Sequence, residues 1–149
     1  MQSSDWIPPT TDRVVRHTEE ELNARIQRQT EANVAYYASH DRRLLDIRLQ
    51  ELDREWDIER ILEANAAMVS LIGLSFGRFF SRRWFLLPMA VAGFLLQHAV
   101  QGWCPPVALF RRLGVRTQRE IDEERYALKV LRGDFKPADP HGVLQSVRA

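Results

Sequence analysis

The sequence lacks the residues on which several classes of protein depend. It has one cysteine among 149 residues, so no internal disulfide can form. Lys129 and Lys136 are its only lysines, although Lys and Arg together number 21 and the net charge is only +1. Acidic residues alternate with arginines along both flanks, so no block of positive charge marks a nucleic-acid interface. We therefore expect no nucleic-acid partner.

Signals for strands and for catalysis are missing as well. There is no Asn-Gly hairpin turn and no run of alternating apolar and polar residues, which indicates an all-α protein. There is also no Gly-rich phosphate loop, no Ser/His/Asp arrangement in a supporting context and no recognisable pair of catalytic carboxylates. We expect a protein that is not an enzyme, with no catalytic residue, no metal and no cofactor.

The sequence does contain a long region, residues 64–104, with very little charge. The stretch 64–80 has 17 residues, or about 25 Å of helix at roughly 1.5 Å per residue, which is the lower limit for a hydrocarbon core of about 30 Å. The stretch Trp84 to Cys104 has 21 residues and no charge. The region predicts a transmembrane hairpin of two spans, joined at a tip around Ser81.

Residues suited to the membrane interface flank both predicted spans. Trp84 and Trp103 are 19 residues apart, which separates them by about 28 Å along a helix, close to the hydrocarbon thickness. Arginine side chains near the ends of a span extend toward the headgroups. We expect the following residues at the membrane interface: Arg78, Arg82, Arg83, Trp84, Trp103, Arg111 and Arg112.

A soluble helical bundle with two buried core helices is the main alternative. The shortness of the first span and the mean hydropathy of −0.33 favour it. The stretches 71–74 and 86–96, however, are apolar around the whole helix, whereas a surface helix has a single apolar stripe. We therefore prefer the membrane interpretation.

The charged flanks predict long amphipathic helices on both sides of the hairpin. Capping boxes at 18–21 and 117–120 mark two helix starts, and Gly133 marks a stop. No proline or glycine lies between Asp41 and Gly73, so one helix could run directly into the first span. The predicted segments are a flexible leader 1–17, a charged amphipathic helical region 18–63, the transmembrane hairpin 64–104, interfacial and cytoplasmic helices 105–133 and a flexible tail 134–149.

The arginine distribution favours cytoplasmic termini. An even number of spans places both termini on one side of the membrane, and the basic residues near the spans are more numerous on the cytoplasmic side. Three arginines lie at the tip, whereas six arginines lie beside the other ends of the two spans: Arg54, Arg60, Arg111, Arg112, Arg116 and Arg119.

Small and polar residues inside the spans indicate contacts between helices. Gly73 and Gly77 have the spacing that allows two helices to approach closely, either within the hairpin or between two protomers. Gln97, Gln101 and Cys104 stand at i, i+4 and i+7 and should face protein. We expect helix packing at Gly73, Gly77, Gln97 and Gln101.

His98 and Cys104 are the weak candidates for a cofactor site. A histidine ligand to haem or a metal, or a reactive thiol at Cys104, would make the protein a redox or sulfur-handling accessory. One histidine and one cysteine six residues apart match no recognised ligand spacing, since structural zinc takes four ligands. A small oligomeric channel lined by Gln97, Gln101 and Asn65 is a further alternative.

Gly102–Pro105 (Gly-Trp-Cys-Pro), followed by Leu113–Thr117 (Leu-Gly-Val-Arg-Thr), resembles a family of small bacterial inner-membrane domains of unknown function related to the transmembrane part of the inner-membrane rhodanese YgaP. The resemblance covers about Arg60 to Thr117 and includes Asn65, whereas a second proline, Pro106, departs from the pattern. It implies a hairpin in the bacterial inner membrane with cytoplasmic termini, prone to dimerise through its spans. No rhodanese catalytic loop is present, so no sulfurtransferase activity is implied.

Taken together, the sequence predicts a non-enzymatic inner-membrane hairpin. Its expected partners are the lipid bilayer and either further copies of itself or another membrane protein.

Overall fold

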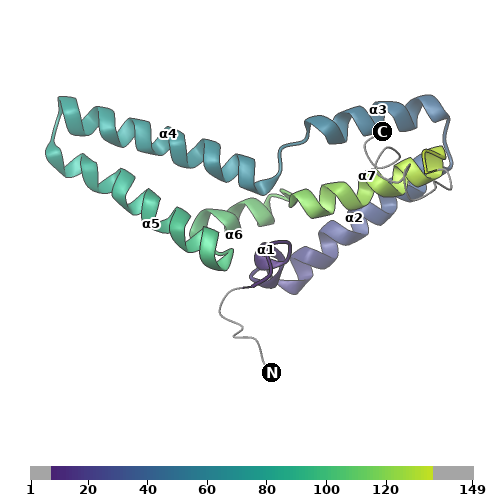
Figure 1. Ribbon diagram of the computed structural model, residues 1–149, viewed down its shortest axis with the longest axis horizontal. Coiled ribbons are helices and arrows are strands. Elements are labelled where there is room, and N and C mark those ends of the chain that lie inside the picture. Colours follow the sequence, from purple (N-terminus) through teal and green to yellow (C-terminus); the bar gives the residue numbers. More distant parts are fainter. Residues whose placement is uncertain (1–7, 136–149) are drawn as a thin grey trace, which may run out of the picture. The chain divides into compact units, whose positions relative to one another are not determined.

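A computed structural model describes residues 8–135, and this part of the chain is helical without strands, which confirms the all-α class (Figure 1). Two compact units are present. The hairpin unit comprises the described residues up to Asn23 together with Trp56–Thr117, and the three-helix unit comprises Ala24–Glu55 together with the described residues from Gln118. The helices are α1 (Arg13–Arg16), α2 (Glu20–Ala38), α3 (Arg42–Arg54), α4 (Ile58–Phe79), η1 (Arg82–Phe85), α5 (Leu86–Gln101), α6 (Pro105–Arg112) and α7 (Gln118–Arg132).

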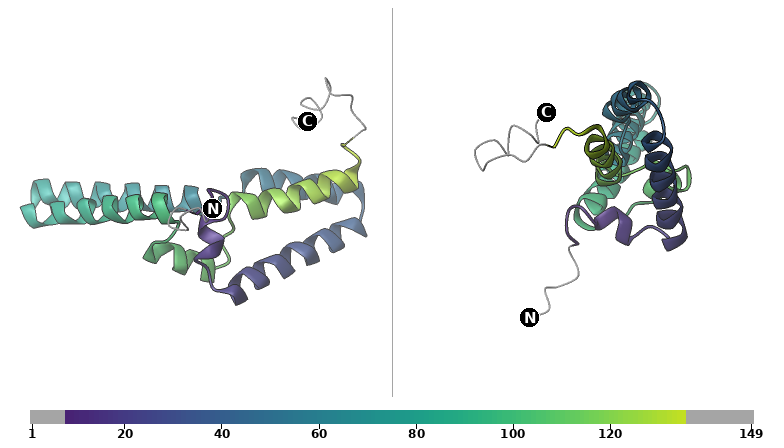
Figure 2. Two further views of the ribbon diagram at one scale, coloured as in Figure 1. Left: turned by 60° about the horizontal axis from the view of Figure 1, so that its bottom comes forward. Right: turned by 90° about the vertical axis from the view of Figure 1, so that its right-hand side faces the viewer.

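The helices α4 and α5 form an antiparallel hairpin and lie side by side (Figure 1 and Figure 2, left). Asp57 begins α4, because its side chain accepts a hydrogen bond of 3.0 Å from the backbone N–H of Arg60. Glu55 and Asp57 both have extended backbones, with φ −64° and ψ 131° at Glu55 and φ −72° and ψ 168° at Asp57. The helix is therefore interrupted between α3 and α4, and no single helix runs from Asp41 into the apolar region. From Ile58 onward, α4 is continuous through its charged first turns into its apolar part.

Two glycines set how closely the hairpin helices approach. A Cβ atom added at Gly73 would lie 2.7 Å from the Cδ atom of Pro88, and one at Gly77 would lie 2.8 Å from the ring of Phe85. Both glycines are buried against the second half of their own hairpin. Their small size is therefore used within one chain, and neither is open for close approach by a second protomer.

The surface of the hairpin is apolar and exposed. The segment Arg82–Gln101 is long and apolar enough to cross a membrane, and only 6% of it is buried, unlike a core helix of a soluble protein. It is the one such segment among the described residues, so the first span remains a prediction. Large apolar side chains of α4 are exposed too, including Met68 (61%) and Leu71 (65%).

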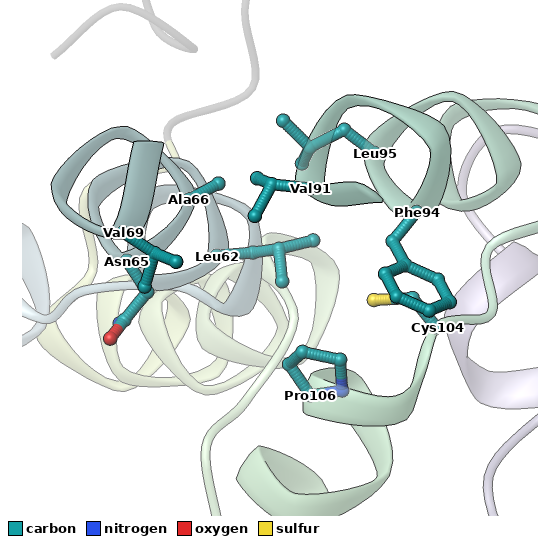
Figure 3. A pocket seen from close by; sticks show the side chains of 9 residues that line it. All are labelled: Leu62, Asn65, Ala66, Val69, Val91, Phe94, Leu95, Cys104 and Pro106. Atoms are coloured by element: carbon teal, nitrogen blue, oxygen red, sulfur yellow. The ribbon is translucent and has the colours of Figure 1, made fainter. Parts of the chain in front are cut away.

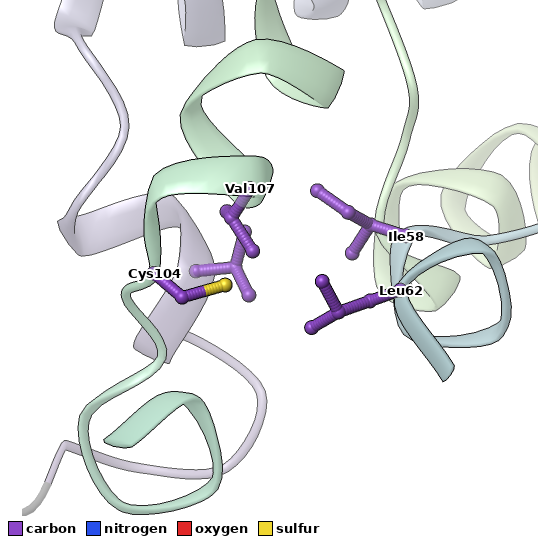
Figure 4. Close-up of a cluster of buried hydrophobic side chains, with 5 residues drawn as sticks. Ile58, Leu62, Cys104 and Val107 are labelled. Atoms are coloured by element: carbon purple, nitrogen blue, oxygen red, sulfur yellow. The ribbon is translucent and has the colours of Figure 1, made fainter. Parts of the chain in front are cut away.

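The base of the hairpin holds a small hydrophobic core. Val14, Ile58, Leu62, Cys104 and Val107 are buried together, with side chains from α1, α4 and α6 converging (Figure 4). The backbone N–H of Ile58 donates a 2.9 Å hydrogen bond to the carbonyl of Arg116, which ties the start of α4 to the end of this unit. Residues 13–16 fall inside the predicted flexible leader but instead form α1, because Val14 packs into this core; residues 1–7 lie outside the described residues.

The three-helix unit buries an apolar stripe of α3, whose leucines recur at spacings of 4 and 3 residues, the period of an amphipathic helix. Leu45, Leu49 and Leu52 pack with Ile121 and Leu128 of α7. Trp56 continues the same spacing but takes no part in this core. It is 47% exposed and lies under the guanidinium of Arg60, 4.4 Å from the ring centroid.

A buried ion pair accompanies the core of the three-helix unit. Glu124 is fully buried on α7 and accepts a hydrogen bond of 2.8 Å from Arg48 of α3. The side chain of Asn33 on α2 donates to the same carboxylate at 3.3 Å.

The helix α7 ends at Gly133 (φ +85°), as the sequence predicts. Only Asp134 and Phe135 of the predicted tail are described, and residues 136–149 lie outside the described range.

Candidate functional site at the base of the hairpin

A tight turn at Gly102 joins α5 to α6. Gly102 has φ +78°, and its N–H donates a 2.7 Å hydrogen bond to the carbonyl of His98. A Cβ atom at this position would lie 2.5 Å from the carbonyl carbon of Arg13 in α1. Glycine is therefore required at position 102 for two reasons: the backbone is left-handed, and α1 approaches too closely for a side chain.

The two residues that follow the turn also have structural roles. Cys104 is 1% exposed, and its extended backbone precedes the first turn of α6. Pro105 begins that helix, where the missing N–H is tolerated and the fixed φ suits the helix start. The motif Gly102–Pro105 thus encodes the path of the backbone out of the second hairpin helix.

Next to this turn, three charged or titratable side chains meet from three helices. Arg13 of α1 donates a 2.8 Å hydrogen bond from Nη2 to Oε1 of Glu59 on α4. His98 of α5 places Nε2 2.7 Å from the other oxygen, Oε2. His98 is 3% exposed. We call these three residues the base cluster.

The environment of Glu59 keeps it ionised. The hydrogen bond from His98 and the contact with Arg13 outweigh the effect of burial and lower the pKa of Glu59 to about 2. An ionised carboxylate only accepts hydrogen bonds, so His98 carries a proton on Nε2. The opposite ring nitrogen, Nδ1, is buried and makes no hydrogen bond within the described part of the chain.

An apolar pocket of about 180 Å³ lies beside the same turn, between α4, α5 and α6 (Figure 3). Leu62, Val91 and Leu95 point toward one another between the two hairpin helices, and Pro106 closes the pocket from α6 (Figure 3). No charged side chain lines it, so the pocket suits a hydrocarbon group. The full lining is Leu62, Asn65, Ala66, Val69, Val91, Phe94, Leu95, Cys104 and Pro106.

The polar residues of the spans are not brought together. Asn65 is exposed, and its Nδ2 donates a 2.8 Å hydrogen bond to the carbonyl of Ile61 in its own helix. Gln97 is exposed and Gln101 is half-buried. Gln97 therefore does not pack against the first hairpin helix within one chain, and its predicted role in helix packing stays a prediction.

The predicted interface arginines differ in their surroundings. Arg111 is 1% exposed, and it donates to the carbonyl of Val115 at 3.0 Å and to the side chain of Asn23 at 2.8 Å. It is therefore a buried structural residue, not one that reaches lipid headgroups. Arg112 is exposed and forms a 2.9 Å ion pair with Glu19. Trp103 is 37% exposed, which is compatible with an interfacial position.

Sequence reasoning identified His98 and Cys104 but missed Arg13 and Glu59. Arg13 and His98 lie 46 and 39 residues from Glu59, so no local spacing links them. Each is one charged residue among many in the sequence, and only the tertiary structure brings them together. Within the described residues there is no group of three or more His, Cys, Asp or Glu side chains placed to hold a metal ion.

Comparison with known proteins supplies no relative. No protein-family model, no curated protein and no solved structure matches the chain. The resemblance to the family related to YgaP therefore stays a prediction from the motif residues.

The turn at Gly102 gives a first test. Gly102→Ala should destabilise the protein by about 2 kcal/mol or more, because the side chain meets both a disfavoured φ and the backbone of α1. The measurement is thermal unfolding of the detergent-solubilised chain by circular dichroism. Gly93→Ala is the matched control, because a Cβ there meets nothing within 4 Å, and it should be neutral or stabilise α5 by up to about 1 kcal/mol. Equal stability of both variants would contradict this account of the turn.

The base cluster predicts a dependence of stability on acid pH. Because folding lowers the pKa of Glu59 from 4.5 to about 2, its contribution is complete above about pH 4.5 and is lost as the pH falls toward 2. With 32% of the side chain exposed, we expect about 1–2 kcal/mol. Denaturant midpoints at pH 5, 3.5 and 2.5 should fall more steeply for the wild type than for Glu59→Gln.

Glu63→Gln is the matched control for this measurement, since Glu63 is an exposed carboxylate one turn further along α4. It should retain the wild-type dependence on pH. If Glu59→Gln also retained it, the base cluster would not stabilise the fold through the charge of Glu59.

Proposed function

We propose that this protein is a non-enzymatic integral membrane protein of the bacterial inner membrane. In this proposal the α4–α5 hairpin crosses the bilayer twice and anchors the charged three-helix unit at the membrane. The chain then acts as a scaffold or accessory subunit that associates with further copies of itself or with another membrane protein. The bacterial inner membrane is taken from the family resemblance.

The exposed apolar surface of the hairpin carries this proposal. An apolar segment of this length is ordinarily buried in a soluble protein, yet only 6% of the span-length segment is buried here. Water is a poor solvent for such a surface, whereas lipid tails solvate it well. Its largest exposed apolar side chains include Leu86 (65%), Met89 (68%), Phe94 (45%) and Leu96 (67%).

The two hairpin helices have matched apolar lengths. The apolar part of α4 begins at Ala64, and the 16 residues from there to Phe79, with Arg78 as the one charged residue, give about 24 Å of helix. The 16 residues of α5 give the same length. Arginine side chains at the tip and a slightly thinned bilayer would accommodate the difference from a core of about 30 Å.

The orientation with cytoplasmic termini rests on the arginine count. Six arginines lie near the ends of the spans at the base and three at the tip, and basic residues favour the cytoplasmic side. A double crossing places the three-helix unit on the same side as both termini.

The alternatives receive less support from the structure. A redox or sulfur-handling role would need an accessible thiol, but Cys104 is 1% exposed inside the hydrophobic core at the hairpin base. A channel would need Asn65, Gln97 and Gln101 on one lining surface, and a single chain does not bring them together. The anchoring role uses the exposed surface directly.

Membrane insertion can be tested with two matched substitutions to arginine. Wild-type protein should remain in the membrane pellet after alkaline carbonate washing, because two spans hold it. Leu96→Arg places a charge near the middle of the second span on the proposed lipid-facing surface and should reduce the inserted fraction several-fold, since a charge at mid-span costs about 2.5–3.5 kcal/mol. Val130→Arg, at a 62% exposed position of α7, should have no effect. Wild-type protein in the wash supernatant would overturn the proposal.

Self-association can be tested by disulfide cross-linking in membranes. In a Cys104→Ser background, single cysteines at the outward positions Leu86, Met89 and Leu96 should yield cross-linked dimers or adducts with one partner protein. Cysteine at Leu87 is the control, because this side chain packs against Gly73 inside the hairpin and should not cross-link. Monomers alone at all three outward positions would argue against association through the hairpin.

A further inference from the structure

We propose that the tip of the hairpin is a binding site for the phosphate groups of anionic phospholipids. This inference rests on the proposed function, because it requires the hairpin to be in a bilayer. The residues that form the site are Arg78 at the end of α4 and Arg82 and Arg83 in η1.

The three tip arginines are exposed, and no carboxylate is near them in sequence. Between Glu63 and Glu120 the chain has no acidic residue, so the hairpin beyond the first turns of α4 has no acidic side chain of its own. No ion pair joins any of the three to a carboxylate in the part of the chain that the structure describes. Three positive charges are thus concentrated within six residues.

Arginines at the base of the same unit contrast with those at the tip. Arg13 is paired with Glu59 at 2.8 Å, and Arg112 is paired with Glu19 at 2.9 Å. Arg111 donates its hydrogen bonds to a carbonyl and an amide inside the fold. These three arginines at the base are therefore satisfied within the protein, whereas those at the tip are available to an external anion.

The backbone of the tip is braced, so the arginines project from a defined turn. The N–H of Trp84 donates a 3.0 Å hydrogen bond to the carbonyl of Ser81. The rings of Phe76 and Phe80 lie 5.1 Å apart, and so do those of Phe76 and Trp84. Together with the packing of Phe85 on Gly77, these contacts fix the turn at the end of the hairpin.

Exposed aromatic rings beside the arginines identify lipid as the source of the phosphate. Phe79 is 78% exposed and Phe80 is 76% exposed. Aromatic rings favour the interface between headgroups and tails, where an adjacent guanidinium reaches phosphate oxygens and forms paired hydrogen bonds. A soluble phosphate compound would leave these rings in water. Anionic lipids are preferred over zwitterionic ones because no amine compensates their phosphate.

The test measures which lipids stay bound to the full-length chain. Wild-type protein is reconstituted in bilayers of phosphatidylcholine with about one-tenth phosphatidylglycerol, extracted in mild detergent, and the retained lipids are quantified by mass spectrometry. Each basic residue near a membrane surface favours anionic lipid by about a fivefold factor at most, so we expect enrichment of phosphatidylglycerol on the order of tenfold over the bulk ratio.

The variant R78Q/R82Q/R83Q should lower the retained ratio to near the bulk value. The control R28Q/R43Q/R54Q makes the same change of charge at three exposed arginines of the three-helix unit and should leave the enrichment intact. Enrichment of the tip variant equal to that of the wild type, or no enrichment in the wild type, would overturn the proposal.

The outcome separates this inference from the proposed function. Incorporation of the wild type into pure phosphatidylcholine bilayers tests the hairpin alone. If the chain incorporates there but shows no preference for phosphatidylglycerol, the lipid site is wrong and the membrane anchor stands. If the chain does not incorporate at all, the anchor itself is wrong.

Discussion

The structure depends on one constraint, which is that the apolar surface of the α4–α5 hairpin must be kept from water. The hairpin cannot do this alone, because its two helices bury only the faces that they turn toward each other, which include Gly73 and Gly77. The opposite faces are exposed, and only 6% of the span-length segment within Arg82–Gln101 is buried. A bilayer would solvate this surface without any further protein, and the proposed anchoring role rests on this property.

Contacts at the base of the hairpin hold α1, α4, α5 and α6 in one defined arrangement. The left-handed Gly102 lets the chain leave α5 against the backbone of α1, and Cys104 and Val107 then fill the core with Ile58 and Leu62. Glu59 lies beside this core and is held ionised by its contacts with His98 and Arg13. In such a partly buried site, removal of one partner leaves a charge without compensation, so the three helices are locked in one arrangement.

Both ends of the hairpin are rich in arginine, but the arginines act differently. At the base they are used within the protein, as Arg111 and Arg112 illustrate. At the tip, Arg78, Arg82 and Arg83 have no acidic neighbour, and aromatic rings stand beside them. This asymmetry is the physical basis for our proposal that the arginines at the base stabilise the fold and that those at the tip bind lipid.

The sequence by itself determined the features that depend on local pattern: the all-α class, the uncharged region, the apolar stripe of α3, the stop at Gly133 and the helix starts near Thr18 and Thr117. These follow from composition, periodicity and capping, which act over a few residues. Only the tertiary structure decided the break at 55–57, the burial of Arg111, the outward position of Gln97 and the meeting of Arg13, Glu59 and His98. Each of these depends on contacts between residues far apart in the chain or on which face of a helix a neighbour covers, and no local spacing encodes either.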